Sequence, residues 1–447
     1  MDQKFQKFSL NSFIKNKVNT NSLYSFFSKG FNLFIALISA ILVISIFNET
    51  EQGIYYFLLS LISLGLAAEA GLTMITSVAV TNELNGICKN SINKFYNLIF
   101  DNRSSMSSII GFAYIAFFVV FLIFCLVIFI FFLGSDSIRG AINSKFFIYI
   151  LIIIFFTYIN LISQAVLEGC GRVDLYQKIL IFANALGLIV FLTSLYYEEY
   201  LFAVLYQYGM RSAILFLCLN YYISAWNFIY RLLKYSQIFK YFKSIKNFQL
   251  RLSTSWIAGA IMYYSIVPIT SISSDLKVGG QLGLCFQLFH AILGLGLSWQ
   301  IGSQPLFVNL SRGTFLNFKK FVDLISFKCF ITSTSIALIS MIGIYYFNFG
   351  FDIVERFGGT TNIIPLVFAA ILLTYISPRT AGIRALKKDP FMEISLVTAA
   401  AVCIGTFYLS YNNLSMYIAT LFLLIMIVQS ISVECVFKYW LPYNFNK

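Results

Sequence analysis

Four ionisable side chains stand inside long apolar stretches of this 447-residue chain, and they are the residues best placed to do chemistry. They are Glu69, Arg211, His290 and Glu434. If these stretches cross a bilayer, a charge near the centre costs about 3 kcal/mol or more. Each of the four therefore predicts a role in ligand binding, in ion coupling or in internal hydrogen bonding.

Arg211 has a polar companion one helical turn earlier in the sequence. Gln207 precedes it by four residues, so both side chains project from the same face of a helix. In one interpretation, Arg211 is a fixed cation for an anionic substrate. In the other, it is held in a structural hydrogen-bond network. The sequence favours neither interpretation over the other.

Two apolar stretches carry polar side chains at steps of three and four residues, which places them along one helix face. The stripes are Thr157, Asn160, Gln164 and Glu168, and Gln287, His290, Gly294 and Ser298. Interhelical hydrogen bonding explains such stripes, and we favour it for the first. In the second, His290 is the only histidine of the chain and could couple transport to protons, if the chain is a transporter. A satisfied structural histidine is the alternative.

Prolines mark two candidate hinges. Pro268 lies inside one apolar stretch, and the Gln304-Pro305 pair follows another. Proline removes a backbone donor and kinks a helix, and transporters use such kinks as hinges. Static membrane helices carry proline kinks as well, so the hinge role is one of two interpretations.

The chain shows no arrangement of residues that predicts catalysis or metal binding. Its 8 cysteines are scattered and form no C-x-x-C pair, so we expect neither a zinc site nor a disulfide framework. We expect no cofactor and no enzymatic activity.

The elements that must position the polar residues follow from composition. Apolar residues make up 59% of the chain and charged residues 11%, whereas soluble domains carry about 25% charged residues. Most of the surface must therefore contact lipid. The net charge of +13 does not predict nucleic-acid binding, because no segment is long enough to fold into a basic face outside the membrane.

An all-α, polytopic membrane protein is predicted, because about twelve stretches reach the roughly 20 mostly apolar residues that a transmembrane helix needs. The predicted spans of the first half are 23–47, 53–80, 108–133, 146–167, 179–197 and 200–222. Those of the second half are 252–274, 279–301, 329–349, 363–377, 391–409 and 414–437. The first apolar run is too deep and too long for a cleavable signal peptide, so we expect it to remain as a span.

Basic residues predict the orientation of the spans. Most of the 31 Lys and Arg residues lie in the N-terminal arm, to which we assign Lys29, in the C-terminus and in every second loop. Cytoplasmic segments carry such an excess. The other loops contain only Arg139, Lys145, Lys277 and Arg356. We therefore expect both termini in the cytoplasm, and we attribute the net charge to topology.

The longest basic loop divides the spans six and six. It predicts an N-terminal lobe of residues 1–230, a cytoplasmic linker of residues 231–251 and a C-terminal lobe of residues 252–447. Within the linker, Tyr235, Ile238, Phe242 and Ile245 recur at helical spacing among lysines. This pattern is typical of an amphipathic helix on anionic membrane lipids, and a plain connection is the alternative.

An even number of spans in each half makes the two lobes parallel repeats about an axis along the membrane normal. One internal correspondence supports this arrangement. The segments 53–72 and 280–299 are both second spans of their halves and both begin with Gly after a short external turn. Both continue past the expected membrane thickness.

The segment Glu51-Gln52-Gly53-Ile54-Tyr55, together with Glu69-Ala70-Gly71-Leu72, resembles the second span of the Wzx-type O-antigen flippases. These belong to the multidrug/oligosaccharidyl-lipid/polysaccharide (MOP) exporter superfamily. In that family the span opens with an acidic-x-Gly turn and closes with acidic-x-Gly-Leu, where Asp is more usual than the Glu69 found here. The loop Gly169-Cys170-Gly171-Arg172 after the fourth span is also similar.

The resemblance implies two six-helix lobes around a central cavity lined largely by spans 1, 2, 7 and 8. It implies a flippase of the bacterial inner membrane that moves undecaprenyl-pyrophosphate-linked oligosaccharide by alternating access. Ser25, Ser28 and Asn32 would then line the cytoplasmic mouth with Glu69, and Arg211 would attract pyrophosphate if it faces the cavity. A polysaccharide polymerase and a chain-length regulator are the implied protein partners, and proton or sodium coupling remains open.

Three other classes of membrane protein are alternatives to a flippase. A multidrug/cation antiporter of the same superfamily would present acids to a cationic drug, and Glu69 and Glu434 are compatible with it. A membrane polysaccharide polymerase or glycosyltransferase needs a large external loop for its catalytic residues, and the external loops here are about a dozen residues or fewer. A major-facilitator carrier would need a Gly- and Arg-rich motif between spans 2 and 3, which residues 81–107 lack.

Overall fold

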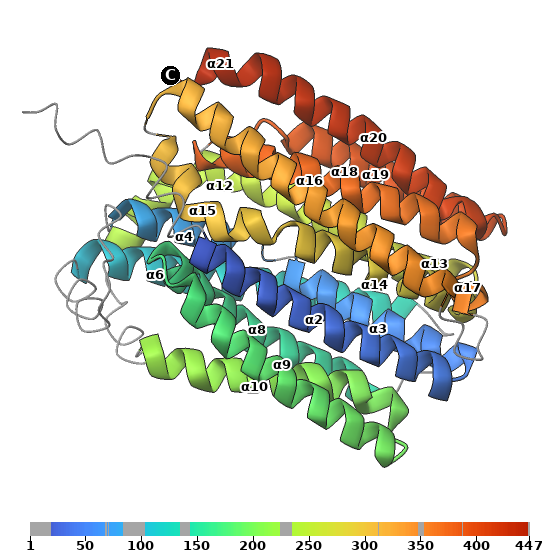
Figure 1. Cartoon of the computed structure of the whole chain (residues 1–447). Coiled ribbons are helices and arrows are strands. Elements are labelled where there is room, and N and C mark those ends of the chain that lie inside the picture. The colour runs from blue at the N-terminus through green and yellow to red at the C-terminus, as the bar shows by residue number, and fades with distance from the viewer. Residues whose placement is uncertain are drawn as a thin grey trace, which may run out of the picture.

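The computed structural model shows two bundles of long helices, one from each half of the chain (Figure 1). The N-terminal lobe is coloured blue to green and the C-terminal lobe yellow to red (Figure 1). Every regular element in the described part of the chain is a helix. The structure describes residues 19–67, 69, 71–83, 103–134, 144–223, 235–311, 313–346, 353–386 and 388–445.

The helices of the N-terminal lobe are α2 (Asn19–Ile46), α3 (Glu49–Ala67), α4 (Leu72–Glu83), α6 (Arg103–Gly134), α8 (Ser144–Gly169), α9 (Val173–Tyr196) and α10 (Tyr200–Ile223).

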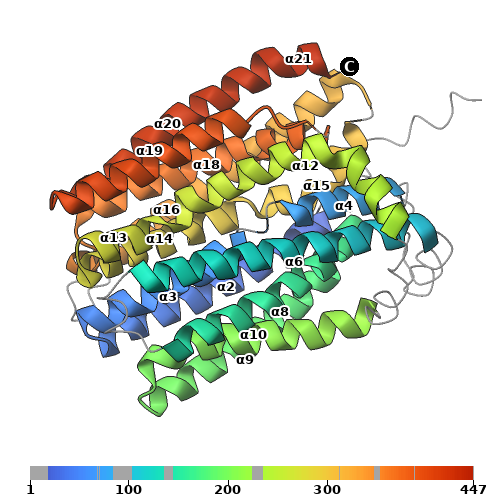
Figure 2. The same cartoon turned by 180° about the vertical axis from the view of Figure 1, so that it is seen from behind.

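The C-terminal lobe begins with α12 (Tyr235–Tyr264), α13 (Ile266–Ser273), α14 (Leu276–Gly296), α15 (Ser298–Leu310), α16 (Phe315–Tyr346) and α17 (Ile353–Arg356). It continues with α18 (Thr360–Ala385), α19 (Met392–Tyr411), the short η3 (Ser415–Tyr417), α20 (Ile418–Cys435), η4 (Val436–Trp440) and α21 (Leu441–Asn444). Figure 2 shows α12 running along the back of the molecule between the two lobes.

The prediction of an all-α polytopic membrane protein is confirmed. Among the described residues, 10 helices are long and apolar enough to cross a membrane, and the bent pair α12 and α13 makes up to 11. The α3 and α4 pair occupies the position of the predicted second span. Large apolar side chains such as Leu338, Ile339 and Ile404 are exposed on the outer helices, as lipid contact requires.

Three of the predicted spans are interrupted. The second breaks between α3 and α4, where Gly71 has a φ of 69°, a conformation that glycine adopts readily. The seventh bends by 47° between α12 and α13. Pro268 explains this bend, because proline cannot donate the hydrogen bond to the carbonyl of Tyr264. The eighth is interrupted at Leu297, between α14 and α15.

Two expectations about these regions need correction. The Gln304-Pro305 pair lies inside the continuous helix α15, and the interruption lies earlier, at Leu297. The residues of the expected linker from Tyr235 onward do form a helix, but that helix is α12, which runs without a break into the seventh span. Residues 224–234, the first part of the connection, lie outside the described residues.

At one end of the molecule the two lobes pack tightly along α3 and α14. A Cβ atom on Gly280 would come within 3.0 Å of the backbone nitrogen of Gly53, and a Cβ on Gly283 would collide with the side chain of Tyr56. Only glycine permits so close an approach of two helices. The two glycines that open the corresponding second spans therefore meet directly.

Polar contacts reinforce the same end of the interface. The side chain of Gln52 donates to the carbonyl of Gly280 at 3.4 Å and accepts from Arg356 at 3.4 Å. The ammonium of Lys277 lies 2.9 Å from the carboxylate of Glu49. We call this closed region, where α3 and α14 begin, the seam.

Candidate substrate-binding cavity

Away from the seam the lobes separate around two adjoining cavities. The larger has a volume of about 630 Å³ and the second about 370 Å³. We call them the large cavity and the deep cavity. Residues that line both cavities are Lys29, Leu66, Tyr208, Arg211, Tyr263 and Tyr264. Small-molecule sites occupy about 300–1,000 Å³, so each cavity is of ligand size.

The large cavity lies in the half of the molecule that carries the basic loops. Its walls include the last turns of α8 and α18 and the first turns of α9 and α19, and the middle of α10 contributes as well. These helix ends connect to the loops that the charge pattern places in the cytoplasm. Because the seam closes the opposite end, the cavity lies on the side of the basic loops.

Two cations stand on the N-terminal-lobe wall of both cavities. Lys29 of α2 and Arg211 of α10 interact electrostatically with each other, and Lys29 also interacts with Glu168. Within the described residues, neither cation has a carboxylate partner within 4.0 Å. Arg211 lies over the ring of Tyr208 at 5.7 Å. The two cations are therefore available to an anionic ligand.

Arg211 and Gln207 share a helix face, as their spacing predicts, and both line the deep cavity. In the described part of the chain, the Arg211 side chain forms no hydrogen bond that would hold it in a structural network. A role of Arg211 as a fixed cation for an anionic substrate stays a prediction.

The polar stripe of α8 also faces the large cavity. Thr157, Asn160, Gln164 and Glu168 all line it, although we expected interhelical hydrogen bonds to explain them. Only Asn160 bonds to a neighbouring helix, donating to the carbonyl of Ser212 at 2.9 Å. Gln164 donates to Glu168 at 2.7 Å, within its own helix. The stripe is therefore part of the cavity wall.

The other predicted binding residues gather around the deep cavity. Asn32, Gln287 and His290 line it. Asn32 accepts a hydrogen bond from Asn184. Gln287 accepts from the hydroxyl of Tyr56 at 2.7 Å and donates to the carbonyl of Ala36 at 3.0 Å. Gln287 therefore links the two lobes at the closed side of the deep cavity.

His290 packs flat against an aromatic ring. Its imidazole and the ring of Tyr264 are stacked with centroids 4.8 Å apart and planes 17° apart. Phe286 lies 6.3 Å away on the same helix. Among the described residues, no carboxylate lines the deep cavity, so His290 has no acidic partner there. Its coupling role stays a prediction.

Three of the residues expected at the mouth of the cavity lie outside the lining of both cavities. Glu69 lines neither cavity: it is buried in the break of the second span and accepts a hydrogen bond from Thr73 at 2.6 Å. Ser25 and Ser28 are fully buried and also line neither. Pro268, predicted as a hinge, is buried beside Val267 of the deep-cavity wall and lies just after the 47° bend between α12 and α13, and its gating role stays a prediction.

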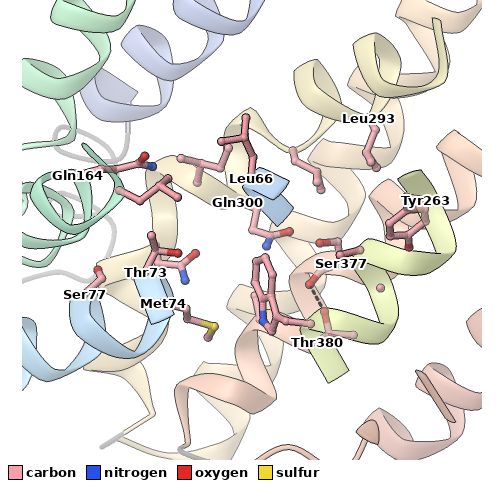
Figure 3. A pocket seen from close by; sticks show the side chains of 18 of the residues that line it. Leu66, Thr73, Met74, Ser77, Gln164, Tyr263, Leu293, Gln300, Ser377 and Thr380 are labelled. Atoms are coloured by element: carbon pink, nitrogen blue, oxygen red, sulfur yellow. Dashed lines mark hydrogen bonds between the residues drawn. The ribbon is translucent and has the colours of Figure 1, made fainter. Parts of the chain in front are cut away.

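The C-terminal lobe supplies an opposite wall that is polar but mostly uncharged. In Figure 3, Ser377, Thr380 and Tyr263 lie on one side of the large cavity, and Thr73, Ser77 and Gln164 on the other, with Gln300 between them. Arg384 is the cation of this wall. It donates to Ser255 at 2.8 Å and lies 3.6 Å from the carboxylate of Asp389.

Sequence reasoning missed Lys29 as a site residue and misjudged Glu434. Lys29 was assigned to the cytoplasmic arm, although its position six residues inside the first apolar run was a signal that it lies within the span. Glu434 is not an unpaired acid, because it forms an ion pair with Arg379. Among the described residues, no group of three or more metal-ligating side chains is close enough to hold a metal ion.

Comparison with solved structures identifies the fold. A multidrug-resistance MATE-family transporter of the MOP superfamily, solved in an outward-facing conformation, matches with a TM-score of 0.57 and 14% identity over 96% of this chain and 95% of that chain. A mutant of the Vibrio cholerae MATE transporter VcmN matches with a TM-score of 0.59 and 13% identity over 97% and 98%. The chain therefore has the two-lobed fold of these transporters.

A third match comes from Pyrococcus furiosus. This MOP-superfamily transporter, described as having a binding pocket of reverse polarity that suggests a different function, has a TM-score of 0.56 and 14% identity over 96% of this chain and 95% of that chain. No protein-family model and no curated protein matches the chain. At these identities the likeness concerns the fold alone.

Proposed function

We propose that this protein is a flippase that moves undecaprenyl-pyrophosphate-linked oligosaccharide from the cytoplasmic to the periplasmic face of a bacterial inner membrane. The observation that carries the proposal is the pair Lys29 and Arg211, which face the cavity between the lobes without a carboxylate partner. A charged side chain within a transmembrane span is costly, and one that lines a cavity without an ion pair within 4.0 Å is where a ligand can supply the negative charge.

The cargo explains why a lined cavity is needed. A pyrophosphate and a set of sugar hydroxyls cannot cross hydrocarbon unaided, because each polar group without a partner costs several kcal/mol there. The cavity offers two cations and many amide and hydroxyl groups, while the prenyl chain stays in lipid. The resemblance of the second span to Wzx-type flippases supports the same cargo.

The geometry also supports a direction and a starting state. If the basic loops are cytoplasmic, the large cavity faces the cytoplasm and the seam closes the periplasmic side. The structure then corresponds to the inward-facing member of an alternating-access pair, ready to receive cargo made in the cytoplasm. A polysaccharide polymerase and a chain-length regulator on the periplasmic side are the proposed partners.

The decisive experiment is deletion of the gene in a host that makes a surface polysaccharide. We expect the long polymer to disappear and lipid-linked repeat units to accumulate on the cytoplasmic face, where a membrane-impermeant sugar-oxidising reagent cannot reach them in intact spheroplasts. Complementation with the wild-type gene should restore both polymer and reagent access. Persistence of the polymer in the deletion strain contradicts the proposal.

A multidrug/cation antiporter is the second candidate, and one observation favours it. Glu168 lines the large cavity and could receive a cationic drug. The two cations of the same wall oppose such a ligand, because like charges repel it at short range. The same deletion strain separates the candidates, since loss of an antiporter raises drug sensitivity and leaves the polymer intact.

A further inference from the structure

We propose that the deep cavity is the subsite for the sugar ring next to the pyrophosphate, an inference that rests on the proposed function and subdivides its cargo. Lys29 and Arg211 stand at the junction of the two cavities, because they line both. A pyrophosphate held by these cations borders the deep cavity. At about 370 Å³ the deep cavity lies near the lower limit of ligand sites, so it takes only part of an oligosaccharide.

The lining of the deep cavity has the chemistry that recognises carbohydrate. The stacked rings of Tyr264 and His290 offer flat aromatic surface, onto which the C–H face of a sugar ring packs. Further aromatic residues of the lining are Tyr55, Tyr56, Tyr208, Tyr263 and Phe286. Tyrosine combines such a surface with a hydroxyl that bonds to sugar hydroxyl groups.

Several hydrogen-bonding groups in this cavity have no protein partner. The side chains of Gln207, Tyr208, Tyr264 and His290 line it, and none of them forms a hydrogen bond to another described residue. The hydroxyl oxygen of Ser39 is buried and also without a partner. Buried polar groups are normally paired, so the unpaired Ser39 hydroxyl is an exception. The other four side chains are half-buried and face the cavity, where a hydroxyl-rich ligand can pair them.

The same lining disfavours two other ligand classes. A cationic drug would meet the like charges of Lys29 and Arg211, and among the described residues no carboxylate lines the deep cavity to offset them. The prenyl chain needs an apolar surface, and it would leave the amide and hydroxyl groups unpaired. An uncharged, hydroxyl-rich ring is not repelled by the two cations, and its hydroxyl groups can pair the amide and hydroxyl groups of the lining.

The test measures binding of two probes to the full-length protein in lipid nanodiscs. The first probe is the lipid-linked repeat unit extracted from a host strain that lacks this protein, and the second is undecaprenyl pyrophosphate without sugar. We expect wild-type protein to bind the first more tightly. Tyr264→Leu and Gln207→Leu should each weaken binding of the first probe about tenfold and leave binding of the second unchanged.

Two further variants guard against loss of folding. Tyr264→Phe keeps the aromatic surface and should retain most of the preference for the sugar-bearing probe. Tyr408→Leu is the matched control, because Tyr408 is exposed on α19 and lines neither cavity. It should bind both probes as the wild type does.

The outcomes separate the two proposals. If the deep-cavity variants weaken binding of both probes equally, or leave the preference of the wild type intact, the sugar subsite is rejected and the flippase proposal stands. If wild-type protein binds neither probe more tightly than it binds an unrelated anionic phospholipid, the flippase proposal itself fails.

Discussion

The two lobes differ in whether the cations within their helices form ion pairs. In the C-terminal lobe, Arg379 is only 7% exposed and lies between two carboxylates, Asp323 at 3.3 Å and Glu434. Its guanidinium also lies over the ring of Tyr375, 4.3 Å from the centroid. In the N-terminal lobe, Lys29 and Arg211 line the cavity, and the described residues offer them no ion pair.

This difference teaches that a charge inside a membrane protein indicates function only when its partner is missing. A paired ion stabilises the lobe in which it lies, and removal of one member leaves the other buried without a counterion. An unpaired cation that lines a cavity is available to a ligand. The following predictions test the contrast, beginning with the largest expected effect.

Arg211→Ala should lower transport about a hundredfold, because it removes a cation that the cargo would otherwise neutralise. Arg211→Lys should keep part of the activity, since the charge remains and the bidentate geometry is lost. Flux of the lipid-linked repeat unit into liposomes measures both, with the amount of folded protein determined in parallel. Full activity of both variants would remove Arg211 from the site.

Arg379→Met should act on stability. It leaves Asp323 and Glu434 without their cation. Both carboxylates are nearly half exposed, so water compensates part of the lost interaction, and we expect a loss of about 2 kcal/mol in the free energy of unfolding. Thermal unfolding in detergent should show the loss, whereas transport per folded molecule should stay close to that of the wild type. A variant of normal stability without transport would place Arg379 in the substrate path.

Lys29→Gln should lower transport about tenfold, less than Arg211→Ala, because one of the two cations remains and lysine acts as a point charge. The variant Lys29→Arg is the matched control and should retain activity. Rising ionic strength should weaken wild-type binding of the pyrophosphate probe more than it weakens binding to Lys29→Gln. Equal salt dependence of the two proteins contradicts a direct role of Lys29.

Lys277→Gln should have the smallest effect. The ion pair between Lys277 and Glu49 lies at the exposed edge of the seam, with each side chain 47% exposed, and exposed pairs contribute little to stability. We expect an unchanged unfolding temperature.

By contrast, Gly283→Leu in the same seam should hold the lobes apart. A pair of cysteines introduced across α3 and α14 measures this, because it should cross-link in the otherwise wild-type protein and fail to cross-link in the Gly283→Leu variant.

Much of the architecture could be predicted from the sequence because hydropathy is a local property. The apolar stretches alone predicted an all-α membrane protein, and most predicted spans overlap observed helices closely, such as 200–222 with α10. The correspondence of the two second spans was also visible in the sequence, but only the structure showed that they meet at Gly53 and Gly280.

The candidate site was predicted only in part. Gln207, Arg211 and His290 were recognised, because a polar residue in an apolar span is visible in the sequence. Lys29 was not, since the boundary of a span shifts by a few residues and a lysine near that boundary is ambiguous. Glu69 was assigned to the cavity because its motif is conspicuous, yet it bonds within its own lobe.

What the sequence determined by itself is the place and apolar character of most of the helices and the set of polar residues inside them. Only the tertiary structure decided which of those residues have partners. Arg379 donates a hydrogen bond to Asp323, which is 56 residues away in the sequence, and Gln287 donates one to Ala36, which is 251 residues away. Whether a buried charge has a partner depends on contacts between helices that are distant in sequence. Helical periodicity shows which face of a helix a residue lies on, but it does not show which helix packs against that face.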